Sequence, residues 1–308
     1  MLCRFLAGRR QDSNRGVQSS PRMNACLSAG VHMTDRLRYG TGEAMQMPWG
    51  SQSAVPGAHI LPASQLHFAV AMAALQTPRG NHLLAALSAT EYERLLPLLK
   101  PVDLPLGQVI YESGSRMAHV YFPTSGIVSL LYLMQDGASA EISVIGNDGL
   151  VGIALLMGGD TTPSRAVVQC AGRAYRLPGV ALKEEFDRDS PLRPLLLRYT
   201  QALITQMAQT AVCNRHHSLD QQLCRWLLLS LDRLNSNQLT MTQELIANML
   251  GVRRQGVTAA ARILQDAGII RYRHGNITVV DRPALEARVC ECYSVVKKEC
   301  DRLLPIRE

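Results

Sequence analysis

Hydrophobic and polar positions divide the chain into segments with different periods. Residues 81–99 carry apolar side chains at nearly helical spacing and predict a helix. From 101 to 177, short runs of β-branched and aromatic residues alternate with glycines, which is typical of an antiparallel barrel or jelly roll. Helical spacing returns over 191–211 and 218–234. The pattern therefore predicts a strand-rich unit followed by helices.

The helix expected over 191–211 has one continuous apolar stripe. On a connecting helix such a stripe can join two copies of a chain, so it predicts a dimer seam. The alternative is that the same stripe packs on the chain's own barrel, since the flanking Leu195, Leu197 and Ile204 leave apolar surface for both uses. The predicted seam consists of Leu192, Leu196, Tyr199, Leu203, Met207 and Thr210.

The segment TQELIANMLGVRRQGVTAAARIL, residues 242–264, has the spacing of a helix-turn-helix. Thr242 is a suitable N-cap for a first short helix. Ala247 is small enough for the point where two helices cross, and Gly251 can adopt the left-handed turn between them. Val257 then fills the core between the helices. These offsets predict two helices that meet at a tight turn.

The second helix, expected over 253–267, has a polar outer face that suits the DNA major groove. Its inner positions are apolar, and Arg and Gln side chains pointing outward can read guanine and adenine edges. The predicted base-reading residues are Arg254, Gln255, Thr258 and Ala259. A two-stranded wing should follow, with a turn at 274–276. Phosphate contacts, which position the protein on DNA, are predicted for Thr242, Gln243, Arg253, Arg262, Arg271 and Arg273.

The charge distribution supports this division of the chain. Residues 1–80 contain eight arginines and three acids, 81–213 ten bases and twelve acids, and 214–308 fourteen bases and ten acids. A near-neutral middle joined to a basic C-terminal part favours a sensing core attached to an anion-binding module. Residues 1–80 lack a sustained period and predict a disordered basic extension, either a solvated tail or an aid to DNA binding. No apolar run is long enough for a membrane span or a signal peptide, so a cytoplasmic protein is expected.

Motifs for catalysis or metal binding are not evident in the sequence. It contains no GxSxG, P-loop, HExxH or clustered carboxylate motif, so an enzyme is not expected. The eight cysteines form no CxxC pair and are expected to be reduced. Cys290 and Cys292 would face different sides of a predicted terminal helix that also carries Cys300, which argues against a four-thiolate zinc site. We therefore predict no metal and no cofactor; redox sensing by Cys290, Cys292 or Cys213 is the alternative to a purely structural role.

Residues from about 81 to 290 resemble the Crp/Fnr family of bacterial transcription regulators. The resemblance is carried by VYFPTSGIVSLLYLMQDG, by EISVIGNDGLVGIALLMGG and by the segment 242–264 with its wing. It implies an α+β protein with a cyclic-nucleotide-binding-like β-roll (jelly roll), a long dimerisation helix and a C-terminal winged helix-turn-helix domain. The expected division is 1–80 extension, 81–190 β-roll, 191–213 dimerisation helix, 214–290 DNA-binding domain and 291–308 helical tail.

The same resemblance implies a homodimer that binds two-fold operator DNA and contacts RNA polymerase. Many family members carry Ser, Glu and Arg where this chain has Arg253, Gln255 and Ala259. The operator sequence is therefore expected to differ from the best-known half-sites, and the recognition helix loses a usual cap.

Cyclic-nucleotide binders of the family use an acid on the ribose and an arginine on the phosphate. At the matching places this chain has Gly152-Ile153 and Ser164-Arg165. Ile153 cannot accept a hydrogen bond from ribose, and Arg165 lies one residue late, on the opposite side of a strand. We therefore expect no tight binding of cyclic AMP, and the effector stays open. The alternative function is a cyclic-nucleotide- or redox-responsive module that acts mainly through protein interaction.

Overall fold

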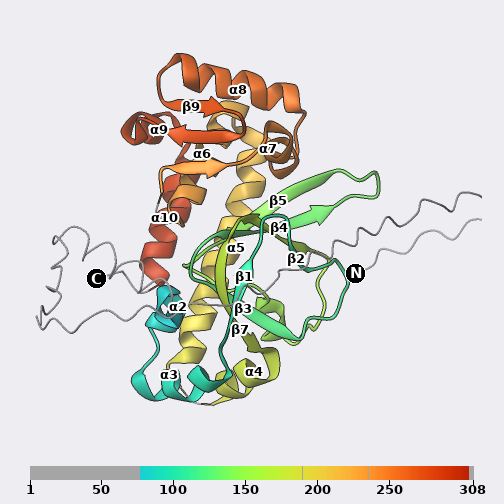
Figure 1. Cartoon of the computed structure of the whole chain (residues 1–308), viewed down its shortest axis with the longest axis vertical. Coiled ribbons are helices and arrows are strands. Elements are labelled where there is room, and N and C mark those ends of the chain that lie inside the picture. Colours follow the sequence, from blue (N-terminus) through green and yellow to red (C-terminus); the bar gives the residue numbers. More distant parts are fainter. Residues whose placement is uncertain (1–76, 189, 235, 305–308) are drawn as a thin grey trace, which may run out of the picture. The chain divides into compact units, whose positions relative to one another are not determined.

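The computed structural model describes residues 77–304, except 189 and 235. The extension predicted for 1–80 lies outside the described residues apart from 77–80. The strand-rich part is a β-roll of two antiparallel sheets, with strand orders β1-β7-β3 and β2-β6-β4-β5 (Figure 1). Its strands are β1 (Lys100–Leu104), β2 (Val109–Tyr111), β3 (His119–Pro123), β4 (Ile127–Leu133), β5 (Ser139–Ile145), β6 (Arg165–Cys170) and β7 (Gly172–Pro178).

Strand β4 explains why residues 127–131 are almost continuously apolar. Val128 and Leu130 face the interior of the roll, whereas Ile127 and Leu131 belong to a second core shared with the C-terminal domain. Both faces of the strand are therefore covered, which removes the usual alternation of apolar and polar residues. Ser129, the polar residue between them, is fully buried and its hydroxyl pairs with the side chain of Gln169.

The helix predicted over 81–99 is divided in the structure into short elements. After η1 (Pro78–Gly80) come α2 (His82–Ala85), α3 (Ala89–Leu95) and η2 (Leu96–Leu98). The division falls at Ser88, whose hydroxyl accepts from the backbone N–H of Glu91 while the Glu91 carboxylate accepts from the N–H of Ser88. This capping box starts a new helix. The second carboxylate oxygen of Glu91 accepts from the N–H of Leu192, 2.9 Å away, and so ties this region to the long helix.

The long helix is α5 (Leu192–His216), which follows η3 (Ile153–Leu155) and α4 (Gly179–Asp187). The stripe predicted as a dimer seam packs mainly on the chain's own β-roll, which is the alternative that the sequence left open. Tyr199 is buried and its hydroxyl donates to the carbonyl of Leu150 at 2.9 Å. An amphipathic stripe indicates that one face of a helix is buried, but it does not identify the element that covers this face. The covered residues are Leu192, Leu196, Tyr199, Leu203 and Thr210, with Met207 half-buried beside them.

The C-terminal domain packs helices around a small sheet of order β8-β10-β9. The helix expected over 218–234 is α6, the predicted wing is β9 and β10, and β8 is an additional strand. The helix expected at the C-terminal end is divided into α9 and α10, because Val289 and Cys290 have extended backbones. The elements are α6 (Leu219–Leu231), β8 (Gln238–Thr240), α7 (Gln243–Leu250), α8 (Arg254–Asp266), β9 (Ile270–Arg273), β10 (Asn276–Val279), α9 (Arg282–Arg288) and α10 (Glu291–Leu303).

Helix α10 returns along α5 toward the β-roll. The guanidinium of Arg198 donates to the carbonyl of Leu303 at 2.9 Å, and the amide of Gln201 donates to Glu299 at 3.1 Å. One side of α5 is therefore occupied by the roll and another by α10. Across the described range, 77–304 without 189 and 235, no helix combines the length and apolar character needed to cross a membrane.

Candidate nucleic-acid interface

Helices α7 and α8 meet at the turn that the sequence predicts. The hydroxyl of Thr242 accepts from the N–H of Leu245 at 3.2 Å and caps α7. Gly251 ends α7 with φ 65°, in the left-handed region where a side chain is strained. Ala247 and Val257 are buried at the contact between the helices, as expected. The local signals that define this motif therefore hold in the folded chain.

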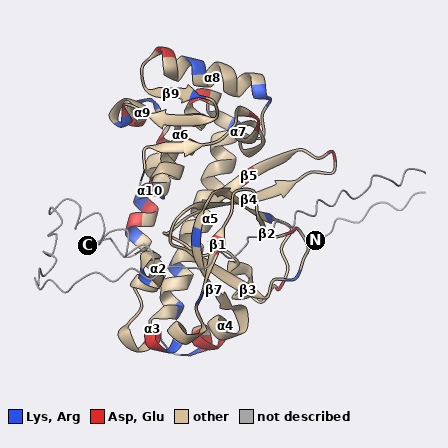
Figure 2. Ribbon diagram, viewed as in Figure 1, with Lys and Arg blue, Asp and Glu red and all other residues tan. Residues whose placement is uncertain are grey.

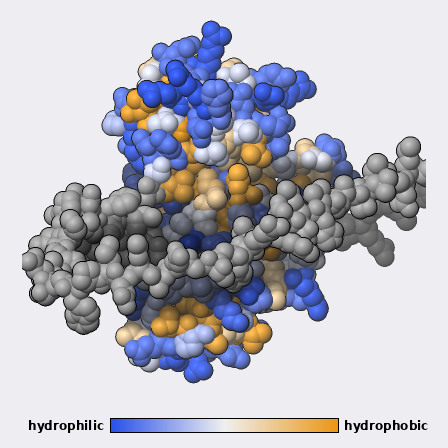
Figure 3. Space-filling view, in the orientation of Figure 1, coloured by the Kyte–Doolittle hydropathy of each residue, from blue (hydrophilic) through white to orange (hydrophobic). Residues whose placement is uncertain are grey.

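The outer face of α8 is polar and open to solvent. Its inner residues Val257, Ala261 and Leu264 are buried, which fixes the rotation of the helix. The hydroxyl of Thr258 donates to the side-chain oxygen of Gln243 at 2.7 Å, so the start of α7 adjoins the exposed face. Figures 2 and 3 show basic residues on α8 and a largely hydrophilic surface over this part of the molecule. The exposed residues are Arg253, Arg254, Gln255, Thr258, Ala259 and Arg262.

Arg253 is the N-cap of α8, and its side chain makes no capping hydrogen bond. This is the structural result of having arginine where many relatives of the predicted family carry serine. The N–H groups of the first turn of α8 are thus left without a side-chain acceptor from the cap, which suits an anion at this helix end.

The wing is held against the same surface. Strands β9 and β10 are joined by His274 and Gly275, with φ 49° and 79°, as a tight type I′ turn requires. The hydroxyl of Tyr272 donates to the carbonyl of Met241 at 2.7 Å and ties β9 to the segment before α7. Arg271 and Arg273 are exposed on β9. A cleft of about 460 Å³ lies between wing and helices, lined by residues that include Thr242, Gln243, Arg254 and His274.

In the expected effector region, Ile153 stands at the position of the ribose-binding acid and Ser164 at that of the phosphate-binding arginine. Gly152 has φ 100° and precedes the short η3 helix, and Ile153 packs against the apolar core of the roll. Ser164 is buried and its hydroxyl pairs with that of Thr162 at 3.1 Å. The guanidinium of Arg165 forms an ion pair of 3.1 Å with Glu112. Ile153 thus offers no acceptor to a ribose hydroxyl, and the nearest arginine is engaged in an ion pair.

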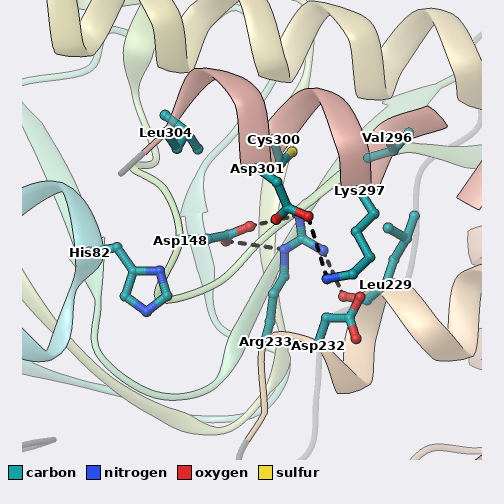
Figure 4. Close-up of a pocket in the computed structure, with 10 residues that line it drawn as sticks. All are labelled: His82, Asp148, Leu229, Asp232, Arg233, Val296, Lys297, Cys300, Asp301 and Leu304. Carbon is teal, nitrogen blue, oxygen red and sulfur yellow. Dashed lines mark hydrogen bonds and ion pairs between the residues drawn. The ribbon is translucent and has the colours of Figure 1, made fainter. Parts of the chain in front are cut away.

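A separate cavity of about 310 Å³ lies between the segment after β5, the end of α6 and α10 (Figure 4). Arg233 and Asp148 form an ion pair across it, with Nη2 and Oδ2 2.8 Å apart. Lys297 lies 3.8 Å from Asp301 on α10. Because each of these cations is paired with a carboxylate, the cavity is poorly suited to a nucleotide phosphate.

Three cysteines and a histidine come together where α5 ends and α10 begins. The ligand atoms of Cys213, His217, Cys290 and Cys292 all lie within 4.8 Å of one another. Burial raises the pKa of the Cys290 thiol to about 12 and also raises that of Cys213. Protonated thiols are weak nucleophiles, which disfavours redox sensing by these two residues.

The expectation that Cys290 and Cys292 face different sides is wrong. Cys290 is the N-cap of α10 and has ψ 164°, so helical geometry does not apply to it. A signal for the cluster is present in the sequence as two closely spaced pairs, Cys213 with His217 and Cys290 with Cys292. Each pair alone is unremarkable, and only the fold brings them together.

Side chains of the β-roll form hydrogen bonds with the C-terminal domain where the two meet. Glu141 on β5 is buried and accepts a hydrogen bond from the indole N–H of Trp226 on α6 at 3.1 Å. The hydroxyl of Ser139 donates to the carbonyl of Asn248 on α7 at 3.4 Å. The helix-turn-helix is therefore in direct contact with the hairpin β4–β5.

Comparison with known proteins agrees with this architecture. Residues 101–189 match the profile of the cyclic nucleotide-binding domain, and residues 221–288 match that of the Crp-like helix-turn-helix domain. Together the two profiles account for about half of the chain. No curated protein sequence matches the chain.

Several solved structures have a similar fold. A Crp/Fnr-family transcriptional regulator from Eubacterium rectale has 19% identity and a TM-score of 0.54, over 67% of this chain and 96% of its own. FixK2 from Bradyrhizobium japonicum has 17% identity and a TM-score of 0.53, over 62% and 98%. A Crp/Fnr-family regulator from Thermus thermophilus has 20% identity and a TM-score of 0.51, over 61% and 97%. With its β-roll, long helix and winged helix-turn-helix in the same order, the chain belongs to the Crp/Fnr family of transcription regulators.

Proposed function

We propose that this protein binds a two-fold operator as a homodimer and regulates transcription in response to an effector other than cyclic AMP. The observation that carries the proposal is the exposed row of Arg254, Gln255 and Thr258 on α8, whose opposite face is buried. A fixed helix that presents Arg, Gln and Thr to solvent can enter a major groove and read base edges. RNA polymerase is the expected further partner, by analogy with the family.

The base-reading role is tested with the variant Arg254→Ala/Thr258→Ala. The operator is first selected from random duplex DNA with the wild-type protein, and affinity is then measured by fluorescence anisotropy. We expect a loss of about 10- to 100-fold for the selected sequence, because a good base contact discriminates by about 1–3 kcal/mol. Arg302→Ala, an exposed arginine on α10, is the matched control. Unchanged affinity of the double variant would refute this reading face.

The phosphate-binding role of the wing has a different signature. Replacing Arg271 by Ala should weaken binding to selected and unrelated duplexes by the same factor, because phosphate contacts are independent of sequence. The dependence of log affinity on log salt concentration should become shallower by about one. A loss confined to the selected sequence would instead assign Arg271 to base reading.

For the dimer we propose the solvent-exposed side of α5 in place of the seam predicted from the sequence. Leu197, Ile204 and Val212 are 55%, 59% and 47% exposed. Leu197, Ile204 and Ala211 follow one another at intervals of seven residues. Ala208 lies between Ile204 and Ala211 on the same side of the helix, and both alanines are exposed. A 3-4 stripe of this kind is the geometry of a two-stranded helical contact, with small residues that allow close approach.

Replacing Ile204 by Glu should convert the dimer to a monomer, measured by analytical ultracentrifugation of the full chain. Two buried carboxylates would face each other across the two-fold axis without a counterion. Val180→Glu on α4 is the control, since Val180 is 71% exposed and lies on another helix. A dimer that persists in Ile204→Glu would exclude this face.

The effector is proposed to differ from cyclic AMP because Ile153 is apolar and Arg165 is paired with Glu112. Isothermal titration with cyclic AMP should give no binding in the micromolar range. Micromolar or tighter binding would contradict this part of the proposal and leave DNA binding unaffected. The alternative, a signalling module that acts through protein contacts, requires that no duplex be enriched from the random library.

A further inference from the structure

Four potential metal ligands meet at the two ends of the DNA-binding domain. Cys213 lies in the last turn of α5 and His217 is the residue that caps its C-terminal end, just before α6. Cys290 is the N-cap of α10, and Cys292 lies in its first turn. The Sγ atoms of Cys213 and Cys290 are 3.6 Å apart, and Nδ1 of His217 is 3.4 Å from Sγ of Cys292. The three cysteines are almost completely buried.

These two separations are close to those in a tetrahedral zinc site, and all four ligand atoms lie within 4.8 Å of one another. Zn–S bonds of about 2.3 Å and a Zn–N bond of about 2.0 Å place sulfur atoms about 3.8 Å apart and nitrogen about 3.5 Å from sulfur. From this match we infer that Cys213, His217, Cys290 and Cys292 form a structural zinc site that nothing in the known function of the family requires. The pairs Cys-x₃-His and Cys-x-Cys supply three thiolates and one imidazole, a usual ligand set for zinc.

The side chains around the cluster are those that a zinc site needs in its outer layer. Nε2 of His217 lies 3.3 Å from a carboxylate oxygen of Glu291, so the other ring nitrogen is directed toward Cys292. A carboxylate in this position fixes the tautomer and orientation of a ligating histidine. The amide of Gln209 donates to Sγ of Cys292 at 3.1 Å. Both contacts would stabilise the ligands in their metal-binding form.

A buried positive charge accompanies the cluster. Arg225 on α6 is 3% exposed and lies close enough to Cys213 to act on its thiol. One of its Nη atoms donates to Thr210 at 3.1 Å, whereas its Nε has no hydrogen-bond partner among the described residues. Three thiolates and one Zn²⁺ carry a net charge of −1, which this guanidinium would balance. Charge balance is needed because an unpaired buried ion is costly.

The site is closed, and this separates it from catalytic zinc. Four protein ligands complete the tetrahedron and leave no position for water or substrate. Zinc binding would release the thiol protons to solvent and would join Cys213 to Cys290, which are 77 residues apart in the chain. The metal would thus fasten both ends of the DNA-binding domain to the end of α5, and would fix how that domain is attached to the effector domain.

The test uses the full chain, purified under reducing conditions with added zinc and then passed over a desalting column. We expect one tightly held zinc ion per chain by mass spectrometry of the metal. Cobalt exchanged into the site should give the thiolate charge-transfer absorption of a tetrahedral Co²⁺ centre. Cys300→Ser, a control on the same helix outside the cluster, should retain both signals. Cys290→Ser/Cys292→Ser should bind less than a tenth as much metal.

Two further measurements keep the result independent of folding defects. His217→Ala removes a ligand whose side chain is 15% exposed. Circular dichroism should show an intact fold, and the cobalt absorption spectrum should be altered or lost. Glu291→Gln should retain the cobalt spectrum but bind zinc about 10-fold more weakly, as is usual for loss of an outer-layer partner.

The proposal would be overturned if reduced wild-type protein held no more zinc than the double cysteine variant. It would also be overturned by a metal-free protein in which mass spectrometry finds a Cys213–Cys290 disulfide, with two hydrogens lost, under the same reducing conditions. DNA affinity is a separate readout, so failure of the zinc proposal leaves the regulator function standing.

Discussion

The buried acid Glu141 makes a quantitative prediction about stability and pH. Burial raises its pKa from 4.5 to about 7, and the positive charges of Arg225 and Arg233 and the hydrogen bond from Trp226 only partly oppose this. One of its carboxylate oxygens has no hydrogen-bond partner among the described residues. Between pH 4.5 and 7 the folded chain therefore holds a proton that the unfolded chain has released. Stability associated with this group is present below pH 4.5 and is lost as pH rises through 7.

The difference between 4.5 and about 7 corresponds to about 3 kcal/mol at about 1.4 kcal/mol per pH unit. The variant Glu141→Gln keeps the shape of the protonated acid and cannot ionise. Its unfolding free energy should therefore exceed that of the wild type by about 3 kcal/mol at about pH 8, and by only about 1 kcal/mol at about pH 5.

The measurement is urea unfolding of both proteins at four pH values from about 5 to about 8, with Glu93→Gln as a control at an exposed acid. The gap between wild type and Glu141→Gln should widen with pH, and the control should follow the wild type. Parallel curves for all three proteins would show that Glu141 does not change its protonation in this range, and the reasoning from burial would fail.

Three other substitutions, one with a matched control, test the packing of the C-terminal domain and its junction with the β-roll. Gly251→Ala should lower the free energy of unfolding by about 1–2 kcal/mol, because φ is 65°. The added methyl group would also lie 3.3 Å from Cβ of Ala140. Gly268→Ala is the control: φ is 72°, but the methyl group would meet no atom within 4 Å, so the loss should be smaller. Leu264→Ala should cost about 3 kcal/mol in urea unfolding, since the side chain is fully buried. Arg233→Leu should cost about 3 kcal/mol because it leaves Asp148 without its partner, and high salt should not mimic the loss.

The helix-turn-helix could be predicted from the sequence because each of its signals is local. The cap at Thr242, the left-handed turn at Gly251 and the apolar face of α8 lie close together in the chain, and the structure confirms their placement. The tight turn of the wing is equally local. Predictions of this kind need no knowledge of what the segment packs against.

The packing partner of the apolar stripe on α5 and the cysteine cluster could not be derived in the same way. The stripe through Leu196 and Leu203 is apolar whether it meets another copy or its own roll, and only tertiary packing decides. The cluster depends on a helix break at Cys290 and on the return of α10 along α5, which joins residues 77 positions apart. Long-range contacts of this type leave no periodic trace in the sequence.

The two-sided burial of β4 has a consequence for recombination between regulators. Ile127, Leu131 and Val144 of the β-roll are part of the core beneath α6 and α7. The hydrophobic core of the DNA-binding domain is therefore completed by residues of the β-roll. A chimera that joins this domain to a foreign sensor at the end of α5 would expose that apolar surface. A graft should therefore include the hairpin 127–145 or match its inward-facing residues. The same three side chains therefore limit which helix-turn-helix domains can be exchanged between regulators of this fold.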